Sequence, residues 1–303
     1  MRRGFTLIEI VVVVAVSAVL ALGSFKALEA LYLKSARARA VTELSLSSQT
    51  ALDQIASLLY QRIPNSVIGY IKEDGTTACE ALEDAAESYR VLEWLGMDEE
   101  RLIAGYYDGF VDMNASSRTR LRAVRLNQDA MGDGGGYNLI FAGTFDGGDE
   151  SVKACHGAFG WHGGESLLAY DVAFSADDTI DINDSVTPDF IYEKYYLSTG
   201  AYAVARGADV DLGGCDDAPF ELSDLADVNT TLFLFYGYRP WAGETFCADP
   251  GDGTKAGRVT VLAEDVSAFS AEALNGVLRL KIDMRRAIRG DGSVHVAKQK
   301  AVF

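Results

Sequence analysis

Glu9 is the only ionisable residue in the 21-residue stretch from Phe5 to Phe25, FTLIEIVVVVAVSAVLALGSF. A helix of that length rises about 31 Å, which is enough to cross the hydrocarbon core of a bilayer. A carboxylate carried deep into lipid costs about 2.5–3.5 kcal/mol, so an acid there is by default a functional residue with a partner. The alternative is that Glu9 lies at the headgroup boundary and is solvated.

Cysteines are the second group with chemical potential, and all four follow the apolar stretch: Cys79, Cys155, Cys215 and Cys247. An even number of cysteines outside the cytoplasm favours disulfides, with three possible connectivities. We expect one bridge to be Cys215–Cys247, because both residues flank acidic, glycine-containing loops around a predicted strand. A metal site built on Cys155, His156 and His162 is disfavoured, because their spacing provides no clear set of four ligands.

Acidic loops are the third group. Residues 177–184, DDTIDIND, cluster oxygen donors as calcium sites do, with Asp178, Asp181, Asn183 and Asp184 as candidate ligands. The segment lacks the glycine and the terminal glutamate of an EF-hand, and solvated turns are the alternative explanation. Residues 146–150 and 249–252 are weaker versions of the same pattern. We predict no resident cofactor, with calcium as the alternative.

Charge and motifs exclude several classes of function. Through Ile63 there are seven basic and four acidic residues, which leaves 20 basic and 40 acidic residues and a net charge of −20 for the remainder. Such a surface repels phosphate backbones, so we expect no direct contact with nucleic acid. The sequence holds no G-x-S-x-G, Walker or H-E-x-x-H motif, and the glycine-rich segment 132–136 lacks a following Lys-Ser/Thr. We therefore predict that the protein is not an enzyme.

The positioning elements begin with a long helix. Residues 27–63 contain neither proline nor glycine, and Pro64-Asn65 ends the helical pattern. Gly23-Ser24 is a candidate bend. Apolar or small side chains recur every three or four residues and predict a stripe that packs on a sheet: Val41, Leu44, Ser48, Leu52, Ile55 and Leu59.

Beyond Pro64 the pattern is mixed and predicts an α+β head in which an antiparallel sheet packs on the helix. We expect a second amphipathic helix over 80–95 and a short helical turn over 98–104. Strands are predicted at 137–145, 166–174, 195–205, 230–238 and 258–263. The clearest strand is 276–287, where apolar and polar residues alternate, and residues 290–292 turn the chain into a hairpin partner at 293–297.

Three explanations of the N-terminus compete. A conventional signal peptide cleaved near Ala21-Leu22-Gly23 is disfavoured by an acid inside the apolar region. A twin-arginine export signal at Arg2-Arg3 is weakened by Glu9 and by the short leader. Residues 4–9, GFTLIE, between a basic leader and a long apolar run, resemble the processing site of type IV prepilins and type II secretion pseudopilins. Residues 262–284 more loosely resemble the larger minor subunits of the J and W types.

The resemblance implies that prepilin peptidase cleaves after Gly4 and methylates Phe5, and that Glu9 contacts the assembly platform and neighbouring subunits. It implies a pilin-like fold with a leader at 1–4, a transmembrane helix at 5–25, a stalk helix at 26–63 and an extracytoplasmic head at 64–303. The chain would cross the inner membrane once, with its head in the periplasm, before it enters a filament. Calcium has precedent, because it stabilises some secretion pseudopilins.

The physics of the cleavage agrees with that role. Cleavage would place a cationic amine one helical turn before Glu9, where it can neutralise this carboxylate or that of a neighbouring subunit. We therefore expect a minor subunit of a type IV pilus or type II secretion pseudopilus, with the tip as one position that tolerates a bulky head. The alternative is a membrane-anchored binding module that recognises a secreted substrate or a surface.

Overall fold

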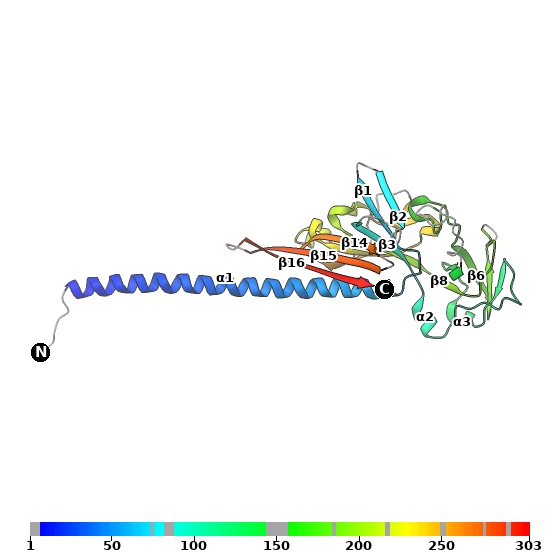
Figure 1. Ribbon diagram of the computed structural model, residues 1–303, viewed down its shortest axis with the longest axis horizontal. Coiled ribbons are helices and arrows are strands. Elements are labelled where there is room, and N and C mark those ends of the chain that lie inside the picture. The colour runs from blue at the N-terminus through cyan, green and yellow to red at the C-terminus, as the bar shows by residue number, and fades with distance from the viewer. Residues whose placement is uncertain are drawn as a thin grey trace.

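A long helix carries a β-rich head at its C-terminal end in the computed structural model of the chain (Figure 1). The structure describes residues 7–73, 76–81, 88–143, 157–183, 186–215, 219–248, 253–274, 277–288 and 292–303. Helix α1, Leu7–Tyr60, is 54 residues long and runs without interruption through Gly23 and Ser24. The Ser24 hydroxyl donates to the Leu20 carbonyl at 2.9 Å, so the candidate bend is ordinary helix.

The second half of α1 buries one stripe against the head: Ala40, Leu44, Ser48, Ala51, Leu52, Ile55, Ala56 and Leu59. The predicted stripe is confirmed except at Val41, which is 42% exposed, while Ala40 is buried. At about 100° per residue, Leu59 lies roughly 100° around the helix from Ala40. The stripe therefore winds around α1. Val41 has the same angular position as Leu59 but lies outside the stripe at its N-terminal end.

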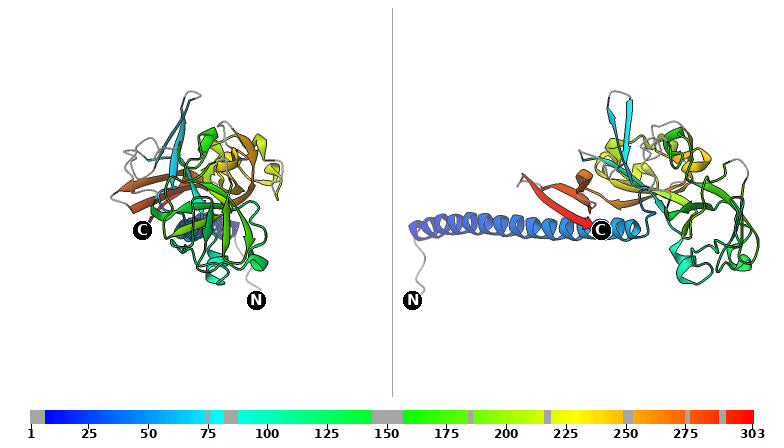
Figure 2. Two further views of the ribbon diagram at one scale, coloured as in Figure 1. Left: turned by 90° about the vertical axis from the view of Figure 1, so that its right-hand side faces the viewer. Right: turned by 45° about the vertical axis from the view of Figure 1, so that its right-hand side comes forward.

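The C-terminal sheet covers this stripe. It has the order β14-β15-β16, with β14 at Val266–Leu274, β15 at Val277–Ile288 and β16 at Gly292–Val302, and both pairings are antiparallel. The sheet lies along α1 in both Figure 1 and Figure 2. In β15 the alternating residues Leu278, Leu280, Ile282 and Met284 are buried, so the predicted strand and its hairpin are confirmed.

A six-stranded sheet forms the centre of the head, in the order β13-β10-β9-β3-β1-β2. Its strands are β1 Ile68–Glu73, β2 Thr76–Ala81, β3 Val91–Gly96, β9 Gly200–Arg206, β10 Leu232–Tyr238 and β13 Arg258–Ala263. One face contributes residues such as Trp94 and Val204 to the core shared with α1. The other face contributes Phe233 and Phe235 to a second core. The β1–β2 hairpin projects away from the rest of the head (Figure 2).

The predicted amphipathic helix over 80–95 is wrong. Ala81 ends β2, residues 82–87 lie outside the described part of the chain, and β3 occupies 91–96. Every residue of β3 is buried, because the strand lies between two cores. A strand buried on both faces shows no alternation, and its short apolar run cannot be told from a helix by periodicity.

A separate β unit is inserted between β3 and β9, and we call it the distal barrel. Its sheet order is β4-β7-β6-β5-β8, with β4 Arg120–Arg122, β5 Asn138–Phe141, β6 Tyr170–Ala176, β7 Thr179–Ile182 and β8 Tyr195–Ser198. The segment around Val111 joins the two edges: the Val111 amide donates to Glu193 beside β8, and Val111 bridges Ala123 beside β4. The barrel has its own core, which includes Leu121, Leu139 and Phe174.

The distal barrel lies at the end of the molecule opposite the N-terminus (Figure 1). Its short helices are α2, Glu99–Ile103, and α3, Gln128–Met131. The predicted turn over 98–104 is confirmed as α2, and the Asp98 side chain caps it by accepting from the Arg101 amide. The insertion begins and ends at paired residues, since Gly96 of β3 lies opposite Gly200 of β9.

The remaining predicted strands match observed ones with shifted ends. Residues 137–145 contain the shorter β5, 166–174 overlaps β6, 195–205 divides into β8 and β9, 230–238 contains β10, and 258–263 is β13. The partner predicted at 293–297 extends to Val302 in β16. Two short strands, β11 at Glu244–Phe246 and β12 at Thr254–Ala256, pair in parallel.

Candidate functional site

The first half of α1 is an apolar surface. Its large apolar side chains from Leu7 to Phe25 are 53–81% exposed. Among the described residues of α1, none before Ala40 is buried. The described part of the chain holds one helix that is long and apolar enough to cross a membrane, and this is α1. Such a surface requires lipid or other apolar helices to cover it.

Glu9 lies in the first described turn of α1 and is exposed. Its neighbours Ile8 and Ile10 are 73% and 55% exposed, so the carboxylate belongs to the same apolar surface. The free amides of a helix N-terminus favour a negative charge there. Gly4 and Phe5, the predicted processing residues, lie outside the described residues.

Ionic contacts fasten the second half of α1 to the C-terminal sheet. Lys300 of β16 donates to Asp53 at 2.5 Å, and Arg286 of β15 donates to Glu43 at 2.5 Å. The hydrogen bond from Lys300, helped by one from Gln49, lowers the pKa of Asp53. These contacts are exposed, so they fix the register of helix and sheet while the buried stripe supplies most of the stability.

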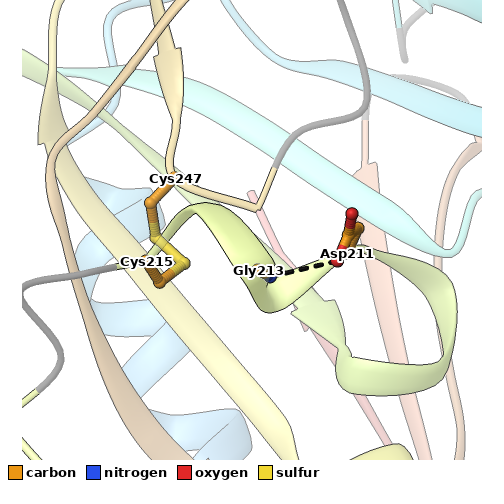
Figure 3. Close-up of a disulfide and its surroundings, with 4 residues drawn as sticks. All are labelled: Asp211, Gly213, Cys215 and Cys247. Carbon is orange, nitrogen blue, oxygen red and sulfur yellow. Dashed lines mark hydrogen bonds between the residues drawn. A yellow bond between two sulfur atoms is a disulfide. The ribbon is translucent and has the colours of Figure 1, made fainter.

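The predicted Cys215–Cys247 bridge is confirmed, with a Cα–Cα distance of 4.7 Å (Figure 3). Cys215 directly follows a 3-10 turn, Leu212–Gly214, in which the Asp211 side chain accepts from the Gly213 amide at 3.0 Å. Cys247 directly follows β11, so the bridge ties a surface turn to the second core. Cys79 is also disulfide-bonded, and Cys155 lies outside the described residues.

Within the acidic segment 177–184, residues 177 and 178 form the turn between β6 and β7, and residues 179–182 are β7 itself. Asp181 pairs with Arg120 at 2.5 Å, and this hydrogen bond lowers the pKa of Asp181. The Asp178 side chain accepts from the Leu126 amide at 2.8 Å and lies 3.4 Å from Arg122. The backbone amide of Asn183 donates to the Asp171 carbonyl at 3.0 Å, and Asp184 is outside the described residues.

These contacts give the loop carboxylates partners within the barrel. Among the residues described, no group of three or more His, Cys, Asp or Glu side chains is arranged to hold a metal ion. The weaker acidic loops at 146–150 and 249–252 fall outside the described residues. His156 is likewise outside, and His162 contacts Glu93 instead of a metal-ligand set.

A buried polar network around Glu93 was not predicted. The Glu93 side chain is 1% exposed, its Oε1 lies 2.8 Å from His162 Nε2, and its Oε2 accepts from the Tyr238 hydroxyl at 2.6 Å. His162 has a left-handed φ of 51°, and a Cβ at Gly160, two residues earlier, would clash with the Pro240 carbonyl oxygen. The network therefore ties a strained turn to strands β3 and β10.

The fold and the exposed helix together define a class: an α+β protein of pilin-like fold, with a long N-terminal apolar helix packed against antiparallel sheets. A family profile described as "Prokaryotic N-terminal methylation motif" matches residues 1–25. The chain thus carries the type IV pilin and pseudopilin signal, which is typical of a structural subunit rather than an enzyme. No curated protein and no solved structure matches the chain.

We predict that Glu93→Gln lowers the free energy of unfolding by about 1–3 kcal/mol, because an amide keeps one acceptor oxygen where the carboxylate has two, so that His162 or Tyr238 loses its buried partner. Denaturant unfolding of the detergent-solubilised chain measures this loss. Glu100→Gln, at an exposed position of α2, is the matched control and should change stability by at most about 0.5 kcal/mol. Equal stability of the Glu93 variant and the wild type would contradict a structural role for the network.

Proposed function

We propose that the protein is a minor pilin or pseudopilin, cleaved by prepilin peptidase after Gly4, methylated at Phe5 and assembled through α1 into a filament. The observation that carries this proposal is the apolar, unburied first half of α1, which includes residues 7–25 of the methylation motif. Lipid covers such a helix before assembly, and the helices of other subunits cover it afterwards. The assembly platform of the inner membrane and other pilin-type subunits are the partners this implies.

Glu9 gives assembly its dependence on processing. Cleavage after Gly4 creates an amine four residues before Glu9, which is about one turn of helix. A buried carboxylate is far less costly when paired with a cation, and loss of one partner is strongly destabilising. The mature N-terminus of one subunit and Glu9 of the same or a neighbouring subunit thus form a contact that the uncleaved precursor lacks.

The position of the distal barrel supports a place at the filament tip. The barrel lies beyond the C-terminal end of α1, on the side away from the apolar segment (Figure 1). In a filament of parallel, staggered helices, the next subunit toward the tip would occupy the space that the distal barrel fills. A subunit of the J or W type at the tip has no further subunit beyond it, so the distal barrel would fit there.

Recognition of a ligand by the head is the second candidate function. The insertion of a complete barrel, with a core of its own, at the far end of the head favours it. Assembly does not require this addition, because α1 and the C-terminal sheet already form the packed stalk. The two functions are compatible, since a tip subunit presents its head outward.

Processing is tested by the mass of the chain in the native membrane. We predict a mature chain that begins at Phe5 and carries one N-terminal methyl group, measured by intact-mass and peptide mass spectrometry. Cells that lack prepilin peptidase provide the control and should contain the chain with Met1 to Gly4 intact. A mature terminus after Gly23, or an intact N-terminus in cells with the peptidase, would refute the proposed processing.

Assembly is tested at Glu9. We predict that Glu9→Val inserts into the membrane and is processed, but is at least about tenfold depleted from sheared filaments, because the cationic terminus loses its partner. Glu29→Gln removes an exposed acid further along α1 and serves as the control, with normal incorporation expected. Wild-type incorporation of Glu9→Val would remove the proposed role of this residue.

A further inference from the structure

A groove opens on the distal barrel beside the closing segment around Val111. Its volume is about 580 Å³, within the range of about 300–1,000 Å³ that is usual for ligand sites. The lining comes from four parts of the barrel: residues 111–114, residues 122–124, and the single residues Asp178 and Glu193. The groove therefore lies at the end of the head that points away from the apolar helix.

The walls of the groove are held by backbone pairing. Val111 bridges Ala123, and the Asp112 amide donates to the Arg122 carbonyl at 2.7 Å. Val111 and Ala123 are each 3% exposed and anchor the site in the barrel core. Met113 and Val124 are 43% and 61% exposed, so the groove offers two apolar side chains to a ligand.

The charge of the groove is negative. Its ionisable side chains are Asp112, Asp178, Glu193 and Arg122, with a formal net charge of −2. The Arg122 guanidinium is directed to the barrel itself, since it contacts Asp178 and donates to the Asp177 carbonyl at 3.4 Å. The Asp112 side chain accepts from the amide of nearby Asn114 at 3.0 Å, and Glu193 is exposed. Within the described part of the chain, neither the Asp112 nor the Glu193 carboxylate forms a salt bridge, so both can face a ligand.

We propose that this groove binds a lysine or arginine side chain in an exposed segment of an exported protein. The aliphatic stem of a basic side chain lies on apolar surface while its charged end stays polar, which matches Met113 and Val124 beside Asp112 and Glu193. Charge complementarity of this kind determines specificity and association rate. The choice of an exported protein rests on the proposed function, which directs the distal barrel outward.

The probe is the fluorescent heptapeptide GSLKLSG, titrated by anisotropy against the full chain in a non-ionic detergent, with GSLELSG as its counterpart. We expect saturable binding of the lysine peptide, at least about tenfold tighter than the glutamate peptide and weaker at high salt. Absence of saturable binding, or equal affinity for the two peptides, would overturn the proposal. Calcium binding in the groove that displaces the lysine peptide would also overturn it, in favour of a metal site.

The groove is tested by the double variant Asp112→Asn with Glu193→Gln, which removes two exposed charges and keeps an oxygen acceptor for the Asn114 amide. We expect it to weaken the lysine peptide about tenfold. The control is Glu221→Gln with Asp224→Asn, an equal charge change at two exposed positions outside the groove, and it should leave affinity unchanged. Equal weakening by both pairs would show that only overall charge matters and would overturn the site.

A third variant separates the apolar contribution. Val124→Ser keeps every charge, and we expect it to weaken the lysine peptide at least about threefold, because the stem of the ligand loses apolar contact. Unchanged affinity would overturn the proposed contact between Val124 and the aliphatic part of the lysine side chain. None of these variants should alter cleavage at Gly4 or entry into filaments, so failure of peptide binding and failure of the proposed function are separate results.

Discussion

The structure depends on the burial of an apolar helix that the described part of its own chain leaves uncovered. From Leu7 to Phe25 the large apolar side chains of α1 are exposed, while the stripe from Ala40 to Leu59 is buried against the head. Full burial of one such side chain contributes about 1.5–3 kcal/mol. The exposed half therefore demands an apolar environment, and both lipid and a bundle of similar helices provide one.

Lipid and a helix bundle are similar apolar surroundings for α1. Under the proposed function, a polar contact therefore decides whether the helix stays in lipid or enters the bundle. Lipid tails are as apolar as leucine or valine, so moving this helix from lipid into a bundle brings little hydrophobic gain. Under the proposed function, this transfer needs a specific interaction that exists only between processed subunits. Glu9, together with an amine created at Phe5, meets that need under the proposed function, and the match of residues 1–25 to the methylation motif supports the same step.

Packed and ionic contacts connect the head to α1. The C-terminal sheet holds α1 by its buried stripe and by the pairs Lys300–Asp53 and Arg286–Glu43. The central sheet shares a core with this sheet and α1, and the distal barrel is inserted where β3 and β9 meet at Gly96 and Gly200. An insertion at a hairpin end disturbs the pairing of the base strands little, which is a structural reason why a large addition is tolerated there.

Local patterns predicted the elements that depend on neighbouring residues. Helix α1, the β15–β16 hairpin and the bridge Cys215–Cys247 follow from periodicity, alternation and turn residues, and all three are present. Strand β3 was mistaken for helix because burial on both faces removes its alternation. The polar network of Glu93 joins residues 69 and 145 positions away, and the groove forms only when the barrel closes through Val111. Such contacts carry no local signal.

The central claim is that protein replaces lipid around the first half of α1. Its most direct measurement is photo-cross-linking from a photoreactive residue in place of Val13, which is 59% exposed, in intact membranes and in sheared filaments. We predict lipid adducts in membranes and, in filaments, adducts to the apolar N-terminal peptide of another chain with a methylated N-terminus. Lipid adducts alone in both fractions, or absence of the chain from filaments, would contradict the account.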